Sequence, residues 1–195
     1  MMDFLGDHPA LDLLNTVVQV NGEAVERWQS GADVAQWLAQ AGYLPGGAAA
    51  AAAAAAAGLP HLLEQARALR ELLRRLVAAR KAGLALDGTD LATLNAALAY
   101  GRRHMALAAG QDGALALRPV YAADTAQQVL APLAESAAEL LAGDFALVKH
   151  CENPECSMWF MDRTKSHRRR WCSMAICGNR HKVASFRQRR ASPPT

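Results

Sequence analysis

Four cysteines in the last quarter of the chain constrain its fold more than any other feature. Cys151 and Cys156 form one pair and Cys172 and Cys177 another, in the pattern C-x4-C-x15-C-x4-C. Thiolates suit structural zinc, and two close pairs joined by a segment long enough for a hairpin can complete a tetrahedron. The spacing predicts one structural zinc ion per chain. Four thiolates leave no open position for a substrate, so a catalytic zinc is not expected.

Two disulfides or four free thiols are the alternatives to a metal site. The first residues do not resemble a secretion signal, because Asp3, Asp7 and Asp12 interrupt the apolar ones and no basic stretch precedes them. No apolar run reaches the length of a membrane span. We therefore expect a cytoplasmic protein with no membrane partner, in which clustered cysteines stay reduced and favour a metal over disulfides.

The residues around the cysteines fit a small zinc module. Segments 158–162 and 168–171 are predicted strands on either side of a polar turn. Ser173 is a candidate N-cap for a helix that begins near Cys177 and runs to about Arg190. A cysteine loop, a hairpin and a second cysteine loop that opens a helix together predict a treble-clef-like zinc finger over residues 146–195.

Several motifs resemble those of the CGNR zinc-finger family. They are Cys177-Gly178-Asn179-Arg180, the first loop Cys151-x-Asn153-Pro154-x-Cys156, and the N-terminal segment Leu11-Asp12-Leu13-Leu14-Asn15-Thr16. The resemblance implies a C-terminal finger joined to an N-terminal domain. Members of the family are described as stress-induced transcription regulators, which implies a stress-response function and DNA as the partner.

Charge is divided unevenly along the chain. The whole sequence has a net charge of +3, and residues 151–195 contain ten Lys or Arg against three Asp or Glu, so 10 − 3 = +7 there and +3 − 7 = −4 in residues 1–150. A basic module joined to an acidic one indicates a polyanionic partner. The basic residues of the finger are therefore candidates for binding nucleic acid.

The predicted final helix supplies most of these candidates. On a helical wheel Ile176, Val183 and Phe186 share one face, which we expect to pack on the finger. The nucleic-acid candidates are His181, Ser185 and Gln188 for base edges, Lys182, Arg187, Arg189 and Arg190 for phosphates, and Arg168, Arg169, Arg170 and Arg180 as further contacts. Arg169 and Arg180 have a structural alternative, support of the zinc site. Trp159 and Trp171 are expected in the small core rather than stacked on bases.

Residues 1–145 predict a mostly helical α+β domain. Helical periodicity marks a short helix after Pro9 and further helices near 30–44, 61–82, 91–99 and 124–141. An Asp-Gly turn between 104–108 and 114–118 predicts an antiparallel hairpin, and 145–150 a strand. The alanines of 48–57 are read as a helical lead-in, and the arginines of 61–82 as a solvated face.

Asp12 and Asn15 are polar residues within an apolar segment. They either bond to backbone or line a small ligand pocket. The leading hypothesis for the whole chain is a zinc-containing, DNA-binding transcription regulator whose N-terminal domain senses a small molecule or forms a homodimer. An RNA-binding module and a protein-interaction adaptor are the alternatives. An enzyme is not expected, because the sequence contains no glycine-rich phosphate loop and no Gly-x-Ser-x-Gly turn.

Overall fold

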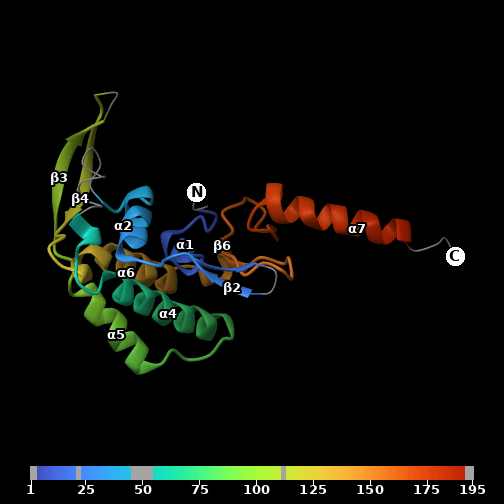
Figure 1. Ribbon diagram of the computed structural model, residues 1–195, viewed down its shortest axis with the longest axis horizontal. Coiled ribbons are helices and arrows are strands. Elements are labelled where there is room, and N and C mark those ends of the chain that lie inside the picture. The colour runs from blue at the N-terminus through green and yellow to red at the C-terminus, as the bar shows by residue number, and fades with distance from the viewer. Residues whose placement is uncertain (1–3, 21–22, 45–54, 111–112, 192–195) are drawn as a thin grey trace. The chain divides into compact units, whose positions relative to one another are not determined.

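The computed structural model of the chain describes residues 4–20, 23–44, 55–110 and 113–191. The chain divides into two compact units (Figure 1). The helical unit is Trp28–Gly143, and the finger unit combines Asp3–Arg27 with Asp144–Thr195. The break at 143/144 lies close to the predicted domain boundary at 145/146. Residues 3–27, which the sequence analysis assigned to the N-terminal domain, group with the cysteine-containing segment.

Four of the helices of the helical unit begin and end near the predicted positions: α2 (Gly31–Gln40), α4 (Leu62–Lys81), α5 (Gly88–Leu98) and α6 (Ala126–Ala142). Polar side chains fix their starts. Ser30 and Asp33 form a reciprocal capping box on α2, Asp87 caps α5, and Thr125 caps α6. The predicted lead-in 48–57 falls mostly outside the described residues, of which 55–57 are helical.

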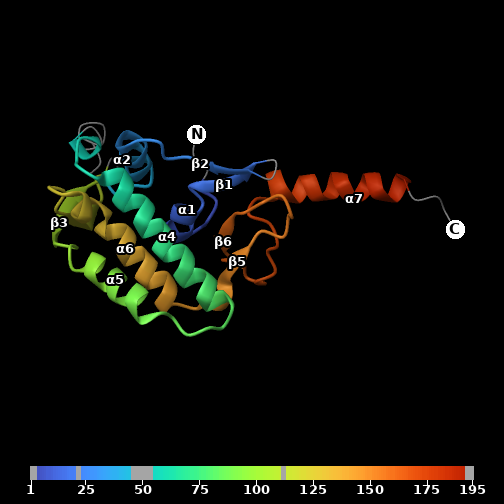
Figure 2. The same ribbon diagram turned by 60° about the horizontal axis from the view of Figure 1, so that its bottom comes forward.

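Helix α4 packs against α2, α5 and α6 (Figure 2). Its leucines form much of the core. Leu62, Leu72, Leu73 and Leu76 are almost completely buried. One expectation for this helix was wrong: Arg70 does not belong to a solvated face, because it is only 3% exposed. Its guanidinium lies 5.5 Å from the ring centre of Trp28, so burial is offset by a cation–π contact.

The predicted hairpin of the helical unit is present as β3 (Arg103–Ala109) and β4 (Leu115–Tyr121). The strands are antiparallel, with Leu107 opposite Leu117. Both leucines lie on an exposed face of the hairpin, where Leu107 is 66% and Leu117 64% exposed. The described part of the chain contains no helix long and apolar enough to cross a membrane.

The finger unit contains short elements. They are α1 (Pro9–Leu14), β1 (Val17–Val20), β2 (Glu23–Glu26), a 3-10 turn η1 (Phe145–Leu147), β5 (Val148–His150), β6 (Trp159–Met161), a π-helical turn η2 (Met174–Gly178) and α7 (Asn179–Ala191). β1 pairs with β2, and β5 with β6, both antiparallel. The fold is α+β with a C-terminal cysteine cluster, as predicted.

The hairpin of the finger differs from the prediction. β6 pairs with β5 rather than with segment 168–171, which is not a strand. The cause is Asp162, which follows β6 and is completely buried. Its carboxylate accepts hydrogen bonds from the backbone N–H groups of Thr164 and Arg169, at 3.1 and 2.9 Å, so the chain folds around this side chain instead of forming a ladder.

Candidate metal centre and its basic helix

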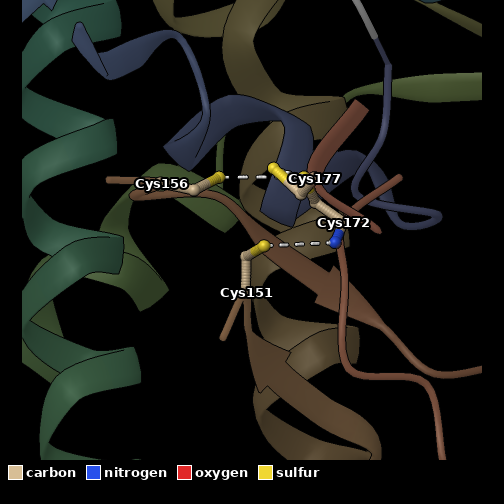
Figure 3. A group of neighbouring side chains, drawn as sticks. All are labelled: Cys151, Cys156, Cys172 and Cys177. Carbon is tan, nitrogen blue, oxygen red and sulfur yellow. Dashed lines mark hydrogen bonds between the residues drawn. The ribbon is translucent and has the colours of Figure 1, made fainter. Parts of the chain in front are cut away.

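The four cysteines converge from three segments of the finger unit (Figure 3). Cys151 follows β5, Cys156 lies in the loop between β5 and β6, and Cys172 and Cys177 flank the start of η2. A turn with a Cys156 N–H to Asn153 C=O bond of 2.9 Å directs Cys156 back towards Cys151. At the second pair, the Ser173 hydroxyl caps η2 by accepting from the N–H of Ile176, as predicted.

The sulfur atoms have the spacing that a tetrahedral zinc ion requires. All four lie within 4.8 Å of one another. Cys172 Sγ is 3.7 Å from Cys156 Sγ and 3.6 Å from Cys177 Sγ. Zn–S bonds of about 2.3 Å place the corners of a regular tetrahedron about 3.8 Å apart. The residues therefore fit a four-thiolate zinc site, and all four predicted ligands are brought together.

Packing the thiols so closely disturbs their ionisation. The contact with Cys156, together with burial, holds the pKa of Cys172 far above its ordinary value, while the hydrogen bond from Cys172 lowers the pKa of Cys156 to about 5. Adjacent thiolates repel in a buried cluster, so one ionises at the expense of its neighbour. A divalent cation at the centre removes this conflict by stabilising all four as thiolates.

Two N–H donors point at the sulfurs from outside the cluster. The side-chain amide of Asn153, itself buried, donates to Cys177 Sγ at 3.4 Å, and the backbone N–H of Cys172 donates to Cys151 Sγ at 3.4 Å. Such donors stabilise thiolate ligands and fix their orientation. In the sequence Asn153 was recognised only as part of the first cysteine loop, and its position between the first two cysteines is the signal for this second role.

Arg169 supports the cysteine cluster. It donates to the carbonyls of Trp171 and Cys172, at 2.9 and 2.5 Å, and its guanidinium lies 4.3 Å from the ring centre of Phe160. It also pairs with Asp7, from the N-terminal segment of the same unit. Of the two interpretations given to Arg169, these contacts favour structural support over nucleic-acid contact.

Asp162 holds the other side of this small core. Its carboxylate accepts from Lys149 Nζ at 2.7 Å and from the Thr164 hydroxyl at 2.6 Å. Burial alone would raise its pKa, but these hydrogen bonds outweigh burial and hold the pKa well below its ordinary value. Asp162 could not be recognised from the sequence, because a single aspartate in a loop belongs to no distinguishing pattern.

The two candidate pocket residues bond to the backbone of the finger unit. The Asn15 amide donates to the Trp159 carbonyl and accepts from the Trp159 N–H, both at 2.9 Å. Asp12 accepts from the Gly6 N–H at 2.7 Å, and burial raises its pKa to about 6. Of the two interpretations offered for this pair, backbone bridging describes the contacts.

Several of the predicted nucleic-acid residues are exposed and still contact a neighbouring side chain. Arg170 pairs with Glu152 at 2.5 Å, and Arg180 approaches Glu155 at 3.8 Å. His181 lies against the Trp171 ring, with centroids 4.7 Å apart, and its Nε2 is 3.4 Å from the Ser185 hydroxyl. Arg168, Lys182 and Arg187 are exposed. The side chains of Gln188, Arg189 and Arg190 lie outside the described part of the structure.

The expected packing face of the final helix was wrong. Ile176, Val183 and Phe186 are 45%, 49% and 53% exposed. The core cluster around the cysteines consists of Phe160, Cys151, Cys172 and Cys177, with Cys156, Met158 and Trp171 against it. This core is too small to cover the length of α7, and the residues of 179–187 are exposed apart from the half-buried Ser185.

Comparison with protein families covers nearly the whole chain. Residues 7–144 match the ABATE family, described as "Putative stress-induced transcription regulator". Residues 148–190 match the CGNR zinc finger. Comparison with individual curated proteins gives no match. The two family matches meet between 144 and 148, and the second contains all four clustered cysteines.

Proposed function

We propose that this chain, which belongs to the ABATE family of putative stress-induced transcription regulators and carries a CGNR zinc finger, is a zinc-containing regulator that binds duplex DNA through helix α7. One zinc ion per chain would be held by Cys151, Cys156, Cys172 and Cys177. The ion would act structurally, because four thiolates complete its coordination. The proposed role is therefore regulatory rather than enzymatic. The proposed location is the cytoplasm.

The attachment of α7 to the metal centre carries this proposal. Cys177 lies in the π-helical turn that leads directly into α7, so the ligand set fixes the first turn of the helix. Arg180, Lys182 and Arg187 then follow on exposed positions. A helix with its side chains is about 10–12 Å across, and the major groove of B-DNA is about 12 Å wide, so α7 can enter it.

The positions along α7 suggest a division of labour. Lys182, Arg187, Arg189 and Arg190 are proposed phosphate contacts, which supply affinity that falls with salt. Gln188 and Ser185 are proposed base contacts. His181 rests on Trp171 and lies beside Ser185, which suits it to hold that hydroxyl in place. Arg168 is an additional exposed cation at the edge of the finger.

The test is a fluorescence anisotropy titration of the full zinc-loaded chain against duplex DNA and single-stranded RNA at two salt concentrations. We expect tighter binding to the duplex. Arg187→Ala should weaken binding to all duplexes and reduce the salt slope by about one unit, whereas Gln188→Ala should act only on a selected site. Arg118→Ala, an exposed arginine of the helical unit, is the matched control.

Three outcomes would contradict the proposal in different ways. Preferential binding of RNA would move the protein to the RNA-binding class. Binding to neither polymer would favour a protein-interaction adaptor. Equal effects of Arg118→Ala and Arg187→Ala would reject α7 as the contact surface.

The helical unit is proposed to sense a small-molecule effector or to mediate a homodimer. Sedimentation of the full chain would test whether it forms a homodimer.

A further inference from the structure

A cavity of about 380 Å³ that is open to solvent lies at the surface of the helical unit, between α4, α5 and α6. Of the residues that line it, Ala68, Thr93, Ala96 and Tyr100 are exposed. Its apolar lining comes from Ala68, Leu69 and Leu72 of α4, Ala96 and Ala97 of α5, and Leu130 of α6. Small alanines on two of the three helices leave the space open, because a larger side chain at any of them would fill it. The volume lies within the range of about 300–1,000 Å³ typical of small-molecule sites.

Four polar side chains also reach the cavity, namely Gln65, Thr93, Tyr100 and Gln127. The amide oxygen of Gln65 is enclosed and accepts no hydrogen bond from any described residue. A buried acceptor without a donor is costly, and rotation about the terminal amide torsion would let a ligand satisfy it. The Thr93 hydroxyl donates to the Thr89 carbonyl at 2.8 Å, which leaves its oxygen able to accept.

The lining is also uncharged: none of the described residues around the cavity is acidic or basic. An ionic ligand would lose part of its hydration there without gaining an opposite charge, which disfavours anions and cations alike. A largely apolar molecule matches the alanine and leucine walls. A donor group on it would meet the acceptors of Gln65 and Thr93.

We propose that this cavity binds a neutral, mainly apolar small molecule with at least one N–H or O–H donor. The inference deepens the regulatory function proposed above and rests on it for the ligand's role as an effector. Binding itself needs only the helical unit, Trp28–Gly143, to which every lining residue belongs. The site also differs from the pocket considered at Asp12 and Asn15, whose polar atoms bond to backbone.

The test uses N-phenyl-1-naphthylamine, a neutral fluorescent probe of two aromatic units joined by one N–H group, titrated into the full zinc-loaded chain. Saturable binding with enhanced fluorescence is expected. Ala68→Leu should fill the cavity and weaken binding at least tenfold. Ala78→Leu, the same change at an exposed position on the same helix, should leave binding unchanged. Ala96→Leu fills the cavity from α5 and replaces Ala68→Leu if that variant does not fold.

The requirement for a donor group on the ligand is tested with one variant and two probes. Gln65→Leu should weaken binding of N-phenyl-1-naphthylamine several-fold. It should not weaken binding of 1-benzylnaphthalene, in which a CH₂ group replaces the N–H group. Probe binding that survives both cavity-filling variants would place the probe elsewhere and overturn the inference, as would no binding to the native chain. If the native chain binds no DNA but binds the probe, and the cavity-filling variants weaken probe binding, the proposed function is rejected and the proposed ligand site is retained.

Discussion

In the helical unit the buried side chains are mostly leucine, valine, alanine and tryptophan, whereas the core around the cysteines of the finger unit consists of Phe160 and three buried cysteines, with few apolar side chains against it. The first unit removes enough apolar surface from water to stabilise its helices. The cluster around the cysteines is too small for this, and it relies on a metal site and on polar side chains with several bonds each. Scarcity of apolar residues thus changes the kind of interaction that determines the fold.

The polar interactions of the finger unit also span longer distances along the chain. Asn15 bonds to Trp159 across 144 residues, and the Gly6 carbonyl accepts from the Met161 N–H at 2.8 Å. In the helical unit, by contrast, α2, α4 and α6 each bury several apolar side chains of their own helix. The two units should consequently respond differently to mutation, which the following variants examine.

Loss of the metal should give the largest effect. Cys172→Ser removes one of four ligands, and because metal ligation contributes on the order of 10 kcal/mol to such modules, the finger should unfold. The helical unit should persist. We expect zinc content to fall from about one equivalent to near zero while most helical circular dichroism remains. Loss of the helical circular dichroism of the whole chain in this variant would mean that the two units share one core.

The reciprocal change is made in the helical unit. Leu73 is fully buried on α4, and Leu73→Ala should cost about 3 kcal/mol by leaving a cavity. Denaturant titration should show this loss in the helical transition, with zinc content unchanged. Leu84→Ala, at a position 65% exposed, is the control and should have almost no effect. Release of zinc from Leu73→Ala protein would remove the distinction between the units.

Within the finger, Asp162→Asn should destabilise by about 3 kcal/mol. The substitution removes the charge that faces Lys149 and leaves a partly buried cation without its partner. The measurement is the free energy of unfolding of the finger at constant free zinc. Glu152→Gln breaks only the exposed pair with Arg170 and should cost less than about 1 kcal/mol. Equal losses in the two variants would show that burial of Asp162 is unimportant.

A smaller effect is expected for Asn15→Ala. The variant leaves the N–H and C=O groups of Trp159 without their partner, at a cost of about 2 kcal/mol. The loss should appear in the finger transition, although Asn15 precedes the first cysteine by more than a hundred residues. Asn95→Ala, an exposed asparagine of α5, provides the control. A loss confined to the helical transition would assign residues 3–27 to the other unit.

The smallest effect concerns Asp12, whose pKa is raised to about 6, mainly by burial and also by Asp7, against the Gly6 N–H, which lowers it. Its protonated form therefore favours the fold: this stabilisation is complete below pH about 4 and is lost as the pH rises through about 6. Asp12→Asn keeps an acceptor for Gly6 without the charge. It should stabilise the finger by about 1 kcal/mol at pH 7.5, a difference that shrinks towards pH 5.5. A pH-independent difference would contradict this.

Sequence was most informative where a pattern repeats or a ligand set is complete. Helical periodicity predicted α4, and the cysteine spacing predicted the cluster. Helical periodicity alone was misleading for α7, because a wheel shows which residues share a face but not whether anything covers it. Ile176, Val183 and Phe186 share a face and remain about half exposed.

The roles that sequence did not reveal depend on single polar side chains. Arg70 belongs to a helix rich in arginine, yet it alone among those described is almost fully buried, over Trp28. Asp162 and Asn153 are individual residues in loops, and their partners become apparent only when distant segments meet. The cavity between α4, α5 and α6 was likewise hidden, since alanines in a helix also mark close packing.

The bond between Asn15 and Trp159 has a consequence for synthesis of the protein. A ribosome adds about 5–20 residues per second, so the 144 residues between these partners take roughly 7–30 seconds to make. During that interval the helical unit can emerge and fold, while Asn15 and the loop at Gly6 wait for β6 and the last two cysteines. The finger can therefore be completed only after the helical unit has been synthesised, and its completion depends on zinc reaching the chain once Cys172 and Cys177 have emerged.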